Sequence, residues 1–351
     1  MNAISRMRKR SSTYSWMSAC TVLLIAVLGQ GVMGIASAQE SFPSRPIRLI
    51  VGLAPGGMAD QAARLLAPGL SRVLGQPVLV ENRVGANGSI AARQVADAPA
   101  DGYTLMVVLD GSLIVGPAMN PVTPFDPVKD FRPLFKLIEA PLTIVAHPGL
   151  TATTLADLLR ERTGAKNATT TITTSYHYGS AGIGSSGHLA GEYLKQLSGL
   201  PWQHVAYKGA ADAMRDTLSG QIPLMIASVG TSLAHVRAGK LKSLAVTSPQ
   251  RLSSMPEVPT VAELASLAPT LKDFNVQAWA ALVAPAALPQ AVSQILQDAT
   301  AKALAEPQLA ERFAAIGAVL APMAGAALAR QIETELVQWR QVISRAQLRS
   351  E

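Results

Sequence analysis

The chain has almost no cysteine, since Cys20 is the only one among 351 residues. It lies in an N-terminal segment with the features of a secretion signal, so we expect the mature protein to contain none. A protein without cysteine has no disulfide, no thiolate ligand for a metal and no cysteine nucleophile. The sequence therefore excludes thiol chemistry and a disulfide-stabilised fold.

Charge is also scarce. Charged residues make up 15% of the chain, and the formal net charge is +7. Removal of residues 1–38 would take away four basic residues and no acidic one, which lowers the net charge to +3. Lysine and arginine form no run with interleaved aromatic residues, so nucleic acid is excluded as a partner.

Patterns for metal binding and hydrolysis are missing as well. The five histidines include no pair three or four residues apart, so a zinc site has no support. Gly184-Ser185-Ser186 begins the G-x-S-x-G pattern of a nucleophile elbow but lacks its second glycine, and Ser112 and Ser228 do not complete it either. We therefore expect no enzyme, no metal and no cofactor. The histidines are His147, His177, His188, His204 and His235.

The N-terminus has the three regions of a signal peptide. Basic residues gather at 6–10, an apolar run follows at 21–29, and small residues at 36–38 offer a cleavage site. The alternative is an uncleaved membrane anchor, which needs about 20 predominantly apolar residues, whereas residues 30–34 contain glutamine and glycine. No second apolar stretch approaches membrane length. We expect a soluble periplasmic protein that begins near Gln39.

Strand and helix patterns alternate through the mature chain, which predicts parallel strands in an α/β fold. The first block has strands at 47–54, 77–83 and 103–110 and helices at 58–75 and 87–98. The second has strands at 142–147, 168–179, 202–208, 222–228 and 241–248 and helices at 154–162, 186–197, 210–218 and 231–238. We expect the helix at 58–75 to be interrupted or kinked near Pro68.

The C-terminal third predicts one strand at 275–285 and helices at 290–305, 308–316 and 328–347. It is too short and too helical for a third domain. The last helix carries an apolar stripe, which we expect to pack back on the first block. The stripe consists of Leu328, Ile332, Leu336, Trp339 and Val342.

This arrangement predicts two lobes, each a mostly parallel sheet flanked by helices. Residues 41–140 and 249–351 would form the first lobe, and residues 141–248 the second. The chain would then cross between the lobes near Ala140 and Ser248. Two crossings are typical of a hinge, with a ligand cleft between the lobes.

A complete G-x-G-x-x-G stands between a strand and a helix of the second block, at Gly182, Gly184 and Gly187. A nicotinamide site would need an acidic residue at the end of the next strand, where Tyr207 and Lys208 stand instead. The motif alone is weak support for a nucleotide site. Its glycines still let backbone N–H groups converge beside a helix N-terminus, which is typical of anion binding.

Two other strand ends of the first block have small residues, Pro55-Gly56-Gly57 and Gly111-Ser112. Because ligands collect at the carboxyl ends of strands in open α/β sheets, we expect these loops to face residues 179–187 across the cleft. Asp60 has a structural interpretation, as a carboxylate at the positive end of a helix, and a ligand-binding one. Trp279 is interpreted as a core residue, although its place before a crossing would also suit the cleft.

The candidate ligand-binding set combines these loops with nearby polar residues. Its members are Pro55, Gly56, Gly57, Asp60, Gly111, Ser112, Gly179, Ser180, Ala181, Gly182, Gly184, Ser185, His188, Tyr207, Ser228 and Trp279.

Five stretches together resemble the Bug family, the periplasmic solute-binding receptors of tripartite tricarboxylate transporters. They are "PIRLIVGLAPGGMAD", "LGQPVLVENRVGANGSIAARQVADAPADGYTL", "YGSAGIGSSGHLAGEYL", "HVAYKGAADAMRDTLSGQ" and "AGKLKSLAVTSPQRLSSMPEVPTVAE". The resemblance runs from about Phe42 to the C-terminus. It implies a monomeric two-lobed receptor that closes over a small carboxylate through backbone groups and water. Membrane permease subunits would be its partners.

The chain departs from the family pattern where the cleft is expected. Ala59 replaces a hydroxyl residue, Ala206 replaces a proline, and the stretch around Pro223 and Ala227-Ser228 lacks an expected acidic and amide pair. These changes put strongly polar or amino-bearing ligands in doubt. An alternative function is a periplasmic receptor that signals through a membrane kinase.

Overall fold

The computed structural model describes residues 42–164 and 175–348. The predicted signal peptide, residues 1–38, and the threonine-rich part of the predicted strand at 168–179 lie outside the described residues. Residues from Pro43 onward form one compact unit. Within the described ranges, no helix combines the length and the apolar character needed to cross a membrane.

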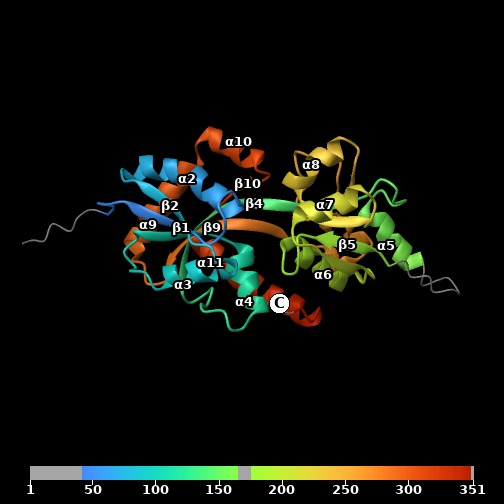
Figure 1. The fold of residues 1–351 in the computed structure, drawn as a ribbon, viewed down its shortest axis with the longest axis horizontal. Helices are drawn as coiled ribbons and strands as arrows, with labels where there is room; N and C mark the ends of the chain where they lie inside the picture. The colour runs from blue at the N-terminus through green and yellow to red at the C-terminus, as the bar shows by residue number, and fades with distance from the viewer. Residues whose placement is uncertain (1–41, 165–174, 349–351) are drawn as a thin grey trace, which may run out of the picture. The chain divides into compact units, whose positions relative to one another are not determined.

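One part of the sheet consists of three parallel strands with β1 in the middle. They are β1 (Ile47–Val51), β2 (Val78–Asn82) and β3 (Thr104–Leu109). The apolar runs of β1 and β3 are buried because α2 (Met58–Leu74) and α3 (Ser89–Ala96) pack on opposite sides of them (Figure 1). The helical connections between these strands account for the parallel pairing.

A second part of the sheet repeats this construction with β5 between two parallel neighbours. The strands are β5 (His177–Ser180), β6 (Gln203–Ala206) and β7 (Leu224–Ser228). The chain passes from β5 to β6 through α6 (Ser186–Ser198) and from β6 to β7 through α7 (Ala210–Leu218). Before β5, α5 (Leu155–Gly164) begins close to the predicted helix start.

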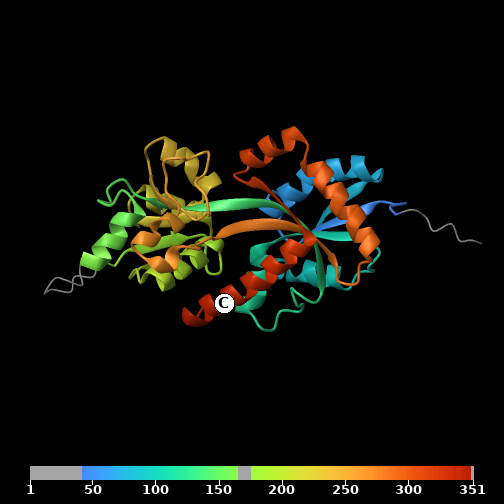
Figure 2. The same ribbon diagram turned by 180° about the vertical axis from the view of Figure 1, so that it is seen from behind.

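The long strand β4 (Phe131–Ala146) joins the two parts. Residues 131–141 of β4 pair antiparallel with β9 (Gln277–Pro285), whereas residues 142–146 pair antiparallel with β7. Both strands can be followed between the two parts in Figures 1 and 2. The predicted strand begins only at residue 142, so residues 131–141 of β4 were not predicted as a strand. The structure accommodates Pro133 at a register shift of the ladder, where a missing N–H costs least.

The strand β8 (Lys242–Val246) also pairs antiparallel with β4. The predicted strand at 241–248 corresponds to it. On the other part of β4 lies β10 (Val319–Ala324), an antiparallel strand that the sequence did not predict. Its ladder shifts register between Leu320 and Met323, on either side of a proline, so the short strand lacks a regular alternating pattern.

Helix α2 is continuous across Pro68, whereas the sequence predicted an interruption or a kink there. It ends at Gly75, which has a φ of 69° and donates its N–H to the Ser71 carbonyl. Helix α9 (Gln290–Leu304) packs against α2 so closely that a Cβ on Gly69 would lie 2.9 Å from the Ala303 Cβ. Tertiary packing of α2 thus outweighs the intrinsic cost of its proline.

The last helix, α11 (Gly325–Arg345), buries its predicted apolar stripe. It packs on β4, as expected for a return to the first part of the sheet, and also contacts α6. The Gln196 Nε2 donates to the Val342 carbonyl at 2.9 Å, and the rings of Tyr193 and Trp339 lie 6.2 Å apart. The stripe is confirmed, and α11 additionally connects the two parts of the sheet.

The short helix α10 (Pro307–Ala315) precedes β10.

The segment between β8 and β9 packs on α6. The Thr270 hydroxyl donates to the Leu197 carbonyl at 2.5 Å, and the rings of Phe274 and Tyr193 stack at 5.4 Å. These contacts attach residues 262–274 to the second part of the sheet. The predicted crossing of the chain near Ser248 stays a prediction. After this segment, β9 runs antiparallel to β4 and leads the chain back to the first part of the sheet.

Candidate functional site

The loop between β1 and α2 holds the predicted residues Pro55, Gly56 and Gly57, all three of which are exposed. Gly56 has a φ of 82°, a conformation that favours glycine, although a Cβ there would meet nothing within 4 Å. The Gly56 N–H donates to the Asp60 carboxylate at 2.8 Å. The first turn of α2 therefore holds the loop that precedes it.

Asp60 is buried, and it is satisfied by groups of this chain. Its carboxylate accepts from the Arg64 Nε at 3.0 Å and from the Asn82 Nδ2 at 2.9 Å, besides the Gly56 N–H. Burial raises the pKa of Asp60, but the hydrogen bonds from Arg64, Gly56 and Asn82 outweigh it and hold the pKa below its ordinary value. This geometry favours the structural interpretation, in which Asp60 positions the loop.

Gly111 and Ser112 lie after β3 in a π-helical turn, η2 (Gly111–Val115), which runs into α4 (Gly116–Met119). Gly111 is half-buried with open space beside its Cα, whereas Ser112 is buried. A Cβ on Gly88 would lie 3.3 Å from the Ser112 Oγ. The loop that contains Gly88, which was not among the predicted site residues, thus lies against the predicted Gly111-Ser112 turn.

That additional loop is Gly85–Gly88, just before α3. All four residues have positive φ, including 45° at Ala86 and 50° at Asn87. Consecutive residues of this kind are costly, and such backbones cluster at functional sites. A Cβ on Gly52, at the end of β1, would lie 2.8 Å from the Gly88 Cα, so the loop adjoins the strand ends. The dipeptide Asn87-Gly88 was the available sequence signal.

The glycine loop, residues 181–185, leaves β5 and leads into α6. The Ser180 Oγ accepts from the Gly182 N–H at 3.1 Å, and the Ser185 Oγ donates to the Gly182 carbonyl at 2.7 Å. Ser185 also caps α6 by accepting the His188 N–H at 3.3 Å. Gly182 and Gly184 have φ values of 128° and 75°, which explains two of the three glycines of the motif.

The third glycine, Gly187, is required by packing, because a Cβ there would lie 2.4 Å from the Ile226 carbonyl oxygen on β7. Gly179 is similar, since its Cβ would lie 2.5 Å from the Ile222 side chain. The motif therefore reflects both turn conformation and the approach of α6 to the sheet. A nucleotide is not needed to explain it.

Several N–H groups of the glycine loop and of the start of α6 have no acceptor within the described part of the chain. Besides Gly187, which packs against β7, they belong to Ala181, Ile183 and Ser186. The Gly184 N–H, by contrast, donates to the His188 Nδ1 at 3.1 Å. A helix N-terminus with several unpaired N–H groups attracts an anion.

Tyr207 and Ser228 lie at the same edge of the sheet as the glycine loop, because β5, β6 and β7 are parallel. A Cβ on Gly182 would lie 2.9 Å from the Tyr207 carbonyl oxygen, and the Tyr207 hydroxyl donates to Asp216 at 3.0 Å. Ser228 precedes α8 (Val229–Arg237), with its hydroxyl 3.0 Å from that of Thr231. The predicted residues of the second block are thus brought together.

The glycine loop also meets the first part of the sheet. A Cβ on Gly184 would lie 2.8 Å from the Met119 Sδ at the end of α4, and α4 continues the turn that contains Gly111 and Ser112. Pro55–Gly57 makes its hydrogen bonds locally, to Ala54 and Asp60. Of the predicted segments in the first part of the sheet, the turn that begins at Gly111 is therefore the one connected to the glycine loop, through Met119 of α4.

Trp279 is buried in the core, with 1% of its surface exposed. Its indole N–H donates to Glu335 at 2.9 Å, and its backbone N–H donates to Asp110 at 3.2 Å. Burial, and then the charge of Glu335, raise the pKa of Asp110 to about 7. The position supports the packing interpretation of Trp279, beneath the turn that begins at Gly111.

Comparison with known proteins identifies the family. Residues 62–348 match the model of the tripartite tricarboxylate transporter family receptor, TctC. The chain belongs to this family. It is a family of solute-binding receptors, so the protein is a receptor and no enzyme. Within the described residues no group of three or more histidine, cysteine or acidic side chains is placed to hold a metal ion.

Two curated relatives of this receptor illustrate the similarity. A UPF0065 protein from the TAR-I ttuE-ttuC' intergenic region of Agrobacterium vitis is 38% identical over 89% of this chain and 87% of its own. Protein BugT of Bordetella pertussis is 34% identical over 84% of this chain and 88% of its own. The Bug-type resemblance inferred from the sequence is confirmed.

Solved structures of similar receptors share the fold. A TctC solute-binding protein from Polaromonas is 27% identical, covers 87% of this chain and 100% of its own, and has a TM-score of 0.76. MatC of Rhodopseudomonas palustris, solved with bound malate, is 29% identical over 86% and 100%, with a TM-score of 0.65. Another R. palustris protein, solved with adipate, is 29% identical over 88% and 99%, with a TM-score of 0.69. The two-lobed α/β receptor fold is therefore shown.

Proposed function

We propose that the protein is a periplasmic receptor that captures a small carboxylate and delivers it to the permease subunits of a tripartite transporter. The observation that carries the proposal is the set of unpaired N–H groups at Ala181, Ile183 and Ser186, beside the N-terminus of α6. Malate and adipate, bound by two similar receptors, are both carboxylates. Charge-assisted hydrogen bonds from backbone N–H groups suit such ligands.

The site would be completed by the loops of the first part of the sheet. Gly56, Gly57, Gly111 and the Gly85–Gly88 loop follow the carboxyl ends of β1 and β3 or adjoin them. In open α/β sheets this edge is where ligands bind. Residues 41–140 with 275–351 would form one lobe, and residues 141–248 with the segment at 262–274, which packs on α6, would form the other, and the two lobes would close over the carboxylate. The strands β4 and β9 would carry the hinge.

The composition of the glycine loop favours a ligand with an apolar body. Ile183 is 43% exposed at the tip of the loop, and Met119 lies beside Gly184. His188, beneath the loop, is 2% exposed, and its Nδ1 is engaged with Gly184. A carboxylate attached to a hydrocarbon chain therefore fits this surface better than a ligand with an amino group.

The test has two parts. Mass spectrometry of the protein released gently from the periplasm would identify a co-purified ligand. Calorimetric titration with adipate, malate and the uncharged adipamide would then establish the role of the carboxylate. We expect saturable binding of at least one carboxylate and none of adipamide. Equal binding of adipate and adipamide, or a co-purified ligand without a carboxylate, would overturn the proposal. Export would be checked by N-terminal sequencing, which should begin near Gln39.

A further inference from the structure

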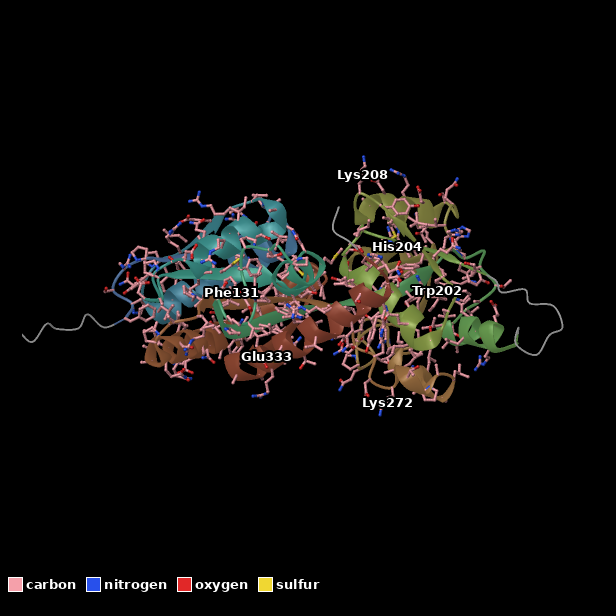
Figure 3. All side chains as sticks on the ribbon, turned by 90° about the horizontal axis from the view of Figure 1, so that it is seen from below. Phe131, Trp202, His204, Lys208, Lys272 and Glu333 are labelled. Atoms are coloured by element: carbon pink, nitrogen blue, oxygen red, sulfur yellow. The ribbon has the colours of Figure 1, made fainter. Side chains whose placement is uncertain are left out.

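Two neutral histidines lie directly beneath the glycine loop. The His188 Nδ1 accepts the Gly184 N–H at 3.1 Å, so this nitrogen carries no proton. The His204 ring stacks on that of His188, with centroids 3.8 Å apart and an angle of 16° between the planes. Figure 3 shows His204 and Trp202 within the second part of the sheet, whereas Lys208 projects from its surface.

His204 reaches the same loop through a serine. Its Nε2 lies 2.7 Å from the Ser180 Oγ, which in turn accepts the Gly182 N–H at 3.1 Å. Each histidine thus supports one of the two loop glycines with positive φ. The Gly184 support requires an unprotonated His188 Nδ1, whereas His204 acts on the loop through the Ser180 hydroxyl.

The charged groups around the pair do not favour protonation. Glu192 on α6 accepts from the Lys195 Nζ at 2.8 Å and from the Tyr178 hydroxyl at 2.9 Å, so its charge is already compensated. Burial lowers the pKa of His188, while Glu192 opposes this and Lys195 adds to it. Burial, His188 and Lys195 lower the pKa of His204 to about 3. Both rings are neutral at neutral pH.

We propose that His188 is a positioning residue of the carboxylate site, which holds the Gly184 N–H through its neutral Nδ1 and releases the glycine loop when it is protonated. The proposal rests on the proposed function for its ligand. The residues on either side of Gly184 are Ile183, whose N–H is unpaired, and Ser185, which caps α6. Fixing Gly184 therefore sets the direction of the neighbouring donor.

The expected pH effect has a distinctive sign. Protonation of the Nδ1 turns an acceptor into a donor that faces the Gly184 donor, so the loop has to move. Carboxylate affinity should then fall on acidification below the ordinary histidine pKa of about 6.5, because burial lowers the pKa of His188. A histidine that contacted the carboxylate directly would have the opposite effect, because its positive charge would raise the affinity.

Three variants separate these alternatives. In His188→Asn the Oδ1 occupies the place of the Nδ1 and accepts the same N–H, but it cannot be protonated. His188→Phe keeps the stacking on His204 and removes the acceptor. His177→Asn changes an exposed histidine at the start of β5, the strand that leads into the glycine loop, and serves as the matched control. Circular dichroism at pH 7.5 would establish that all three are folded.

The first readout needs no ligand. In protein labelled with ¹⁵N-glycine, the Gly184 amide resonance should move as the pH is lowered from 7.5 to 4 in the parent protein and in His177→Asn, because the pKa of His188 is lowered by burial. It should stay nearly constant in His188→Asn. A Gly184 resonance that is insensitive to pH in the parent protein, or one that titrates equally in His188→Asn, would overturn the proposal even if no carboxylate were found to bind.

The second readout uses adipate and malate as probes. At pH 7.5, His188→Phe should bind about tenfold more weakly, which corresponds to one lost hydrogen bond. His188→Asn should recover most of that loss and decline less at acid pH than the parent protein, leaving only the decline caused by protonation of the ligand itself. Tighter binding by the parent protein at acid pH, or unchanged affinity in His188→Phe, would contradict the proposal. Absence of binding by every variant and the parent would count against the proposed function, leaving the resonance readout to decide on the role of His188.

Discussion

The two loops that precede α2 and α6 are built on opposite electrostatic principles. The loop before α2 depends on one ionised, buried carboxylate, Asp60, whose pKa is lowered by the hydrogen bonds that outweigh its burial. The loop before α6 depends on the neutral side chains of Ser180, Ser185 and His188. A charged support keeps its form over a wide range of pH, whereas an imidazole support changes when it is protonated, which for His188 requires a pH below the ordinary histidine pKa of about 6.5.

The difference has a local cause in each case. Asp60 lies in the first turn of a long helix with Arg64 one turn later, so its charge is stabilised within that helix. His188 lies at the start of α6 beneath the loop and stacks on His204, and the acid that acts on it, Glu192, is already paired with Lys195. The same βα connection is therefore stabilised by ion pairing in one part of the sheet and by neutral hydrogen bonds in the other.

The strongest way to break the glycine loop is Gly184→Val. Its φ of 75° disfavours a branched side chain, and a Cβ would lie 2.8 Å from the Met119 Sδ. We expect carboxylate affinity to fall on the order of a hundredfold, because the Gly184 contact with His188 and the adjoining N–H directions are lost together. Calorimetric titration measures the loss. The free energy of unfolding should drop by about 1–3 kcal/mol. A folded variant with parental affinity would show that this loop does not hold the ligand.

The corresponding test of the charged loop is Asp60→Asn. An amide cannot accept from Gly56, Arg64 and Asn82 together, so the free energy of unfolding should fall by about 2–3 kcal/mol at pH 7. The pKa of Asp60 is lowered in the folded protein, so its contribution is present above its ordinary pKa and is lost as the pH falls through the lower folded value.

Urea titrations between pH 7 and 2.5 would measure this difference. The gap between the parent protein and Asp60→Asn should narrow only at the acid end, since the other carboxylates with lowered pKa are common to both proteins. Arg64→Ala is a useful control, because Arg64 is half exposed and its loss leaves Gly56 and Asn82 bonded to Asp60. A gap that is constant with pH would show that the charge of Asp60 does not support its loop.

Trp279→Phe examines a support that lies outside both loops. The substitution leaves the partly buried Glu335 without the indole donor, with Gln331 still donating to it, so the free energy of unfolding should fall by about 1–2 kcal/mol. Carboxylate affinity should change less than threefold, since the ring is in the core. Thermal unfolding and calorimetry measure the two quantities. A loss of affinity greater than tenfold, with stability unchanged, would instead support a direct ligand contact by Trp279.

The smallest expected effect belongs to Gly56→Ala. A Cβ at this position meets nothing within 4 Å, so only the φ of 82° opposes the substitution. The cost should be about 1 kcal/mol, the value typical of a left-handed residue that is not glycine. Chemical denaturation would measure it. A loss of unfolding free energy as large as that of Gly184→Val would indicate that the loop before α2 is tightly packed. The two loops would then differ less in packing than the structure indicates.

Periodicity was sufficient for most of the architecture. The apolar stripe of α11, the strands β1, β3 and β7 and the helices between them follow from local patterns, and the family resemblance rested on contiguous motifs. Local patterns did not predict the part of β4 around Pro133 or the strand β10. Both lie at register shifts along β4, where the partner strand decides how an irregular segment pairs. Such pairing depends on residues more than a hundred positions away and leaves no local signal.

The candidate site shows the same division. The residue pattern alone determined that glycine-rich turns end β1 and β5, that Asp60 stands at a helix start, and that no catalytic or metal-binding constellation exists in the sequence. Only the tertiary structure decided that Gly184 donates to His188, that Gly85–Gly88 adjoins Ser112, and that Trp279 is enclosed by Asp110 and Glu335. Turn and cap preferences act within a few residues, so a sequence reveals them. Which donors remain unpaired depends on side chains that arrive from other strands and helices, and folding alone brings these together.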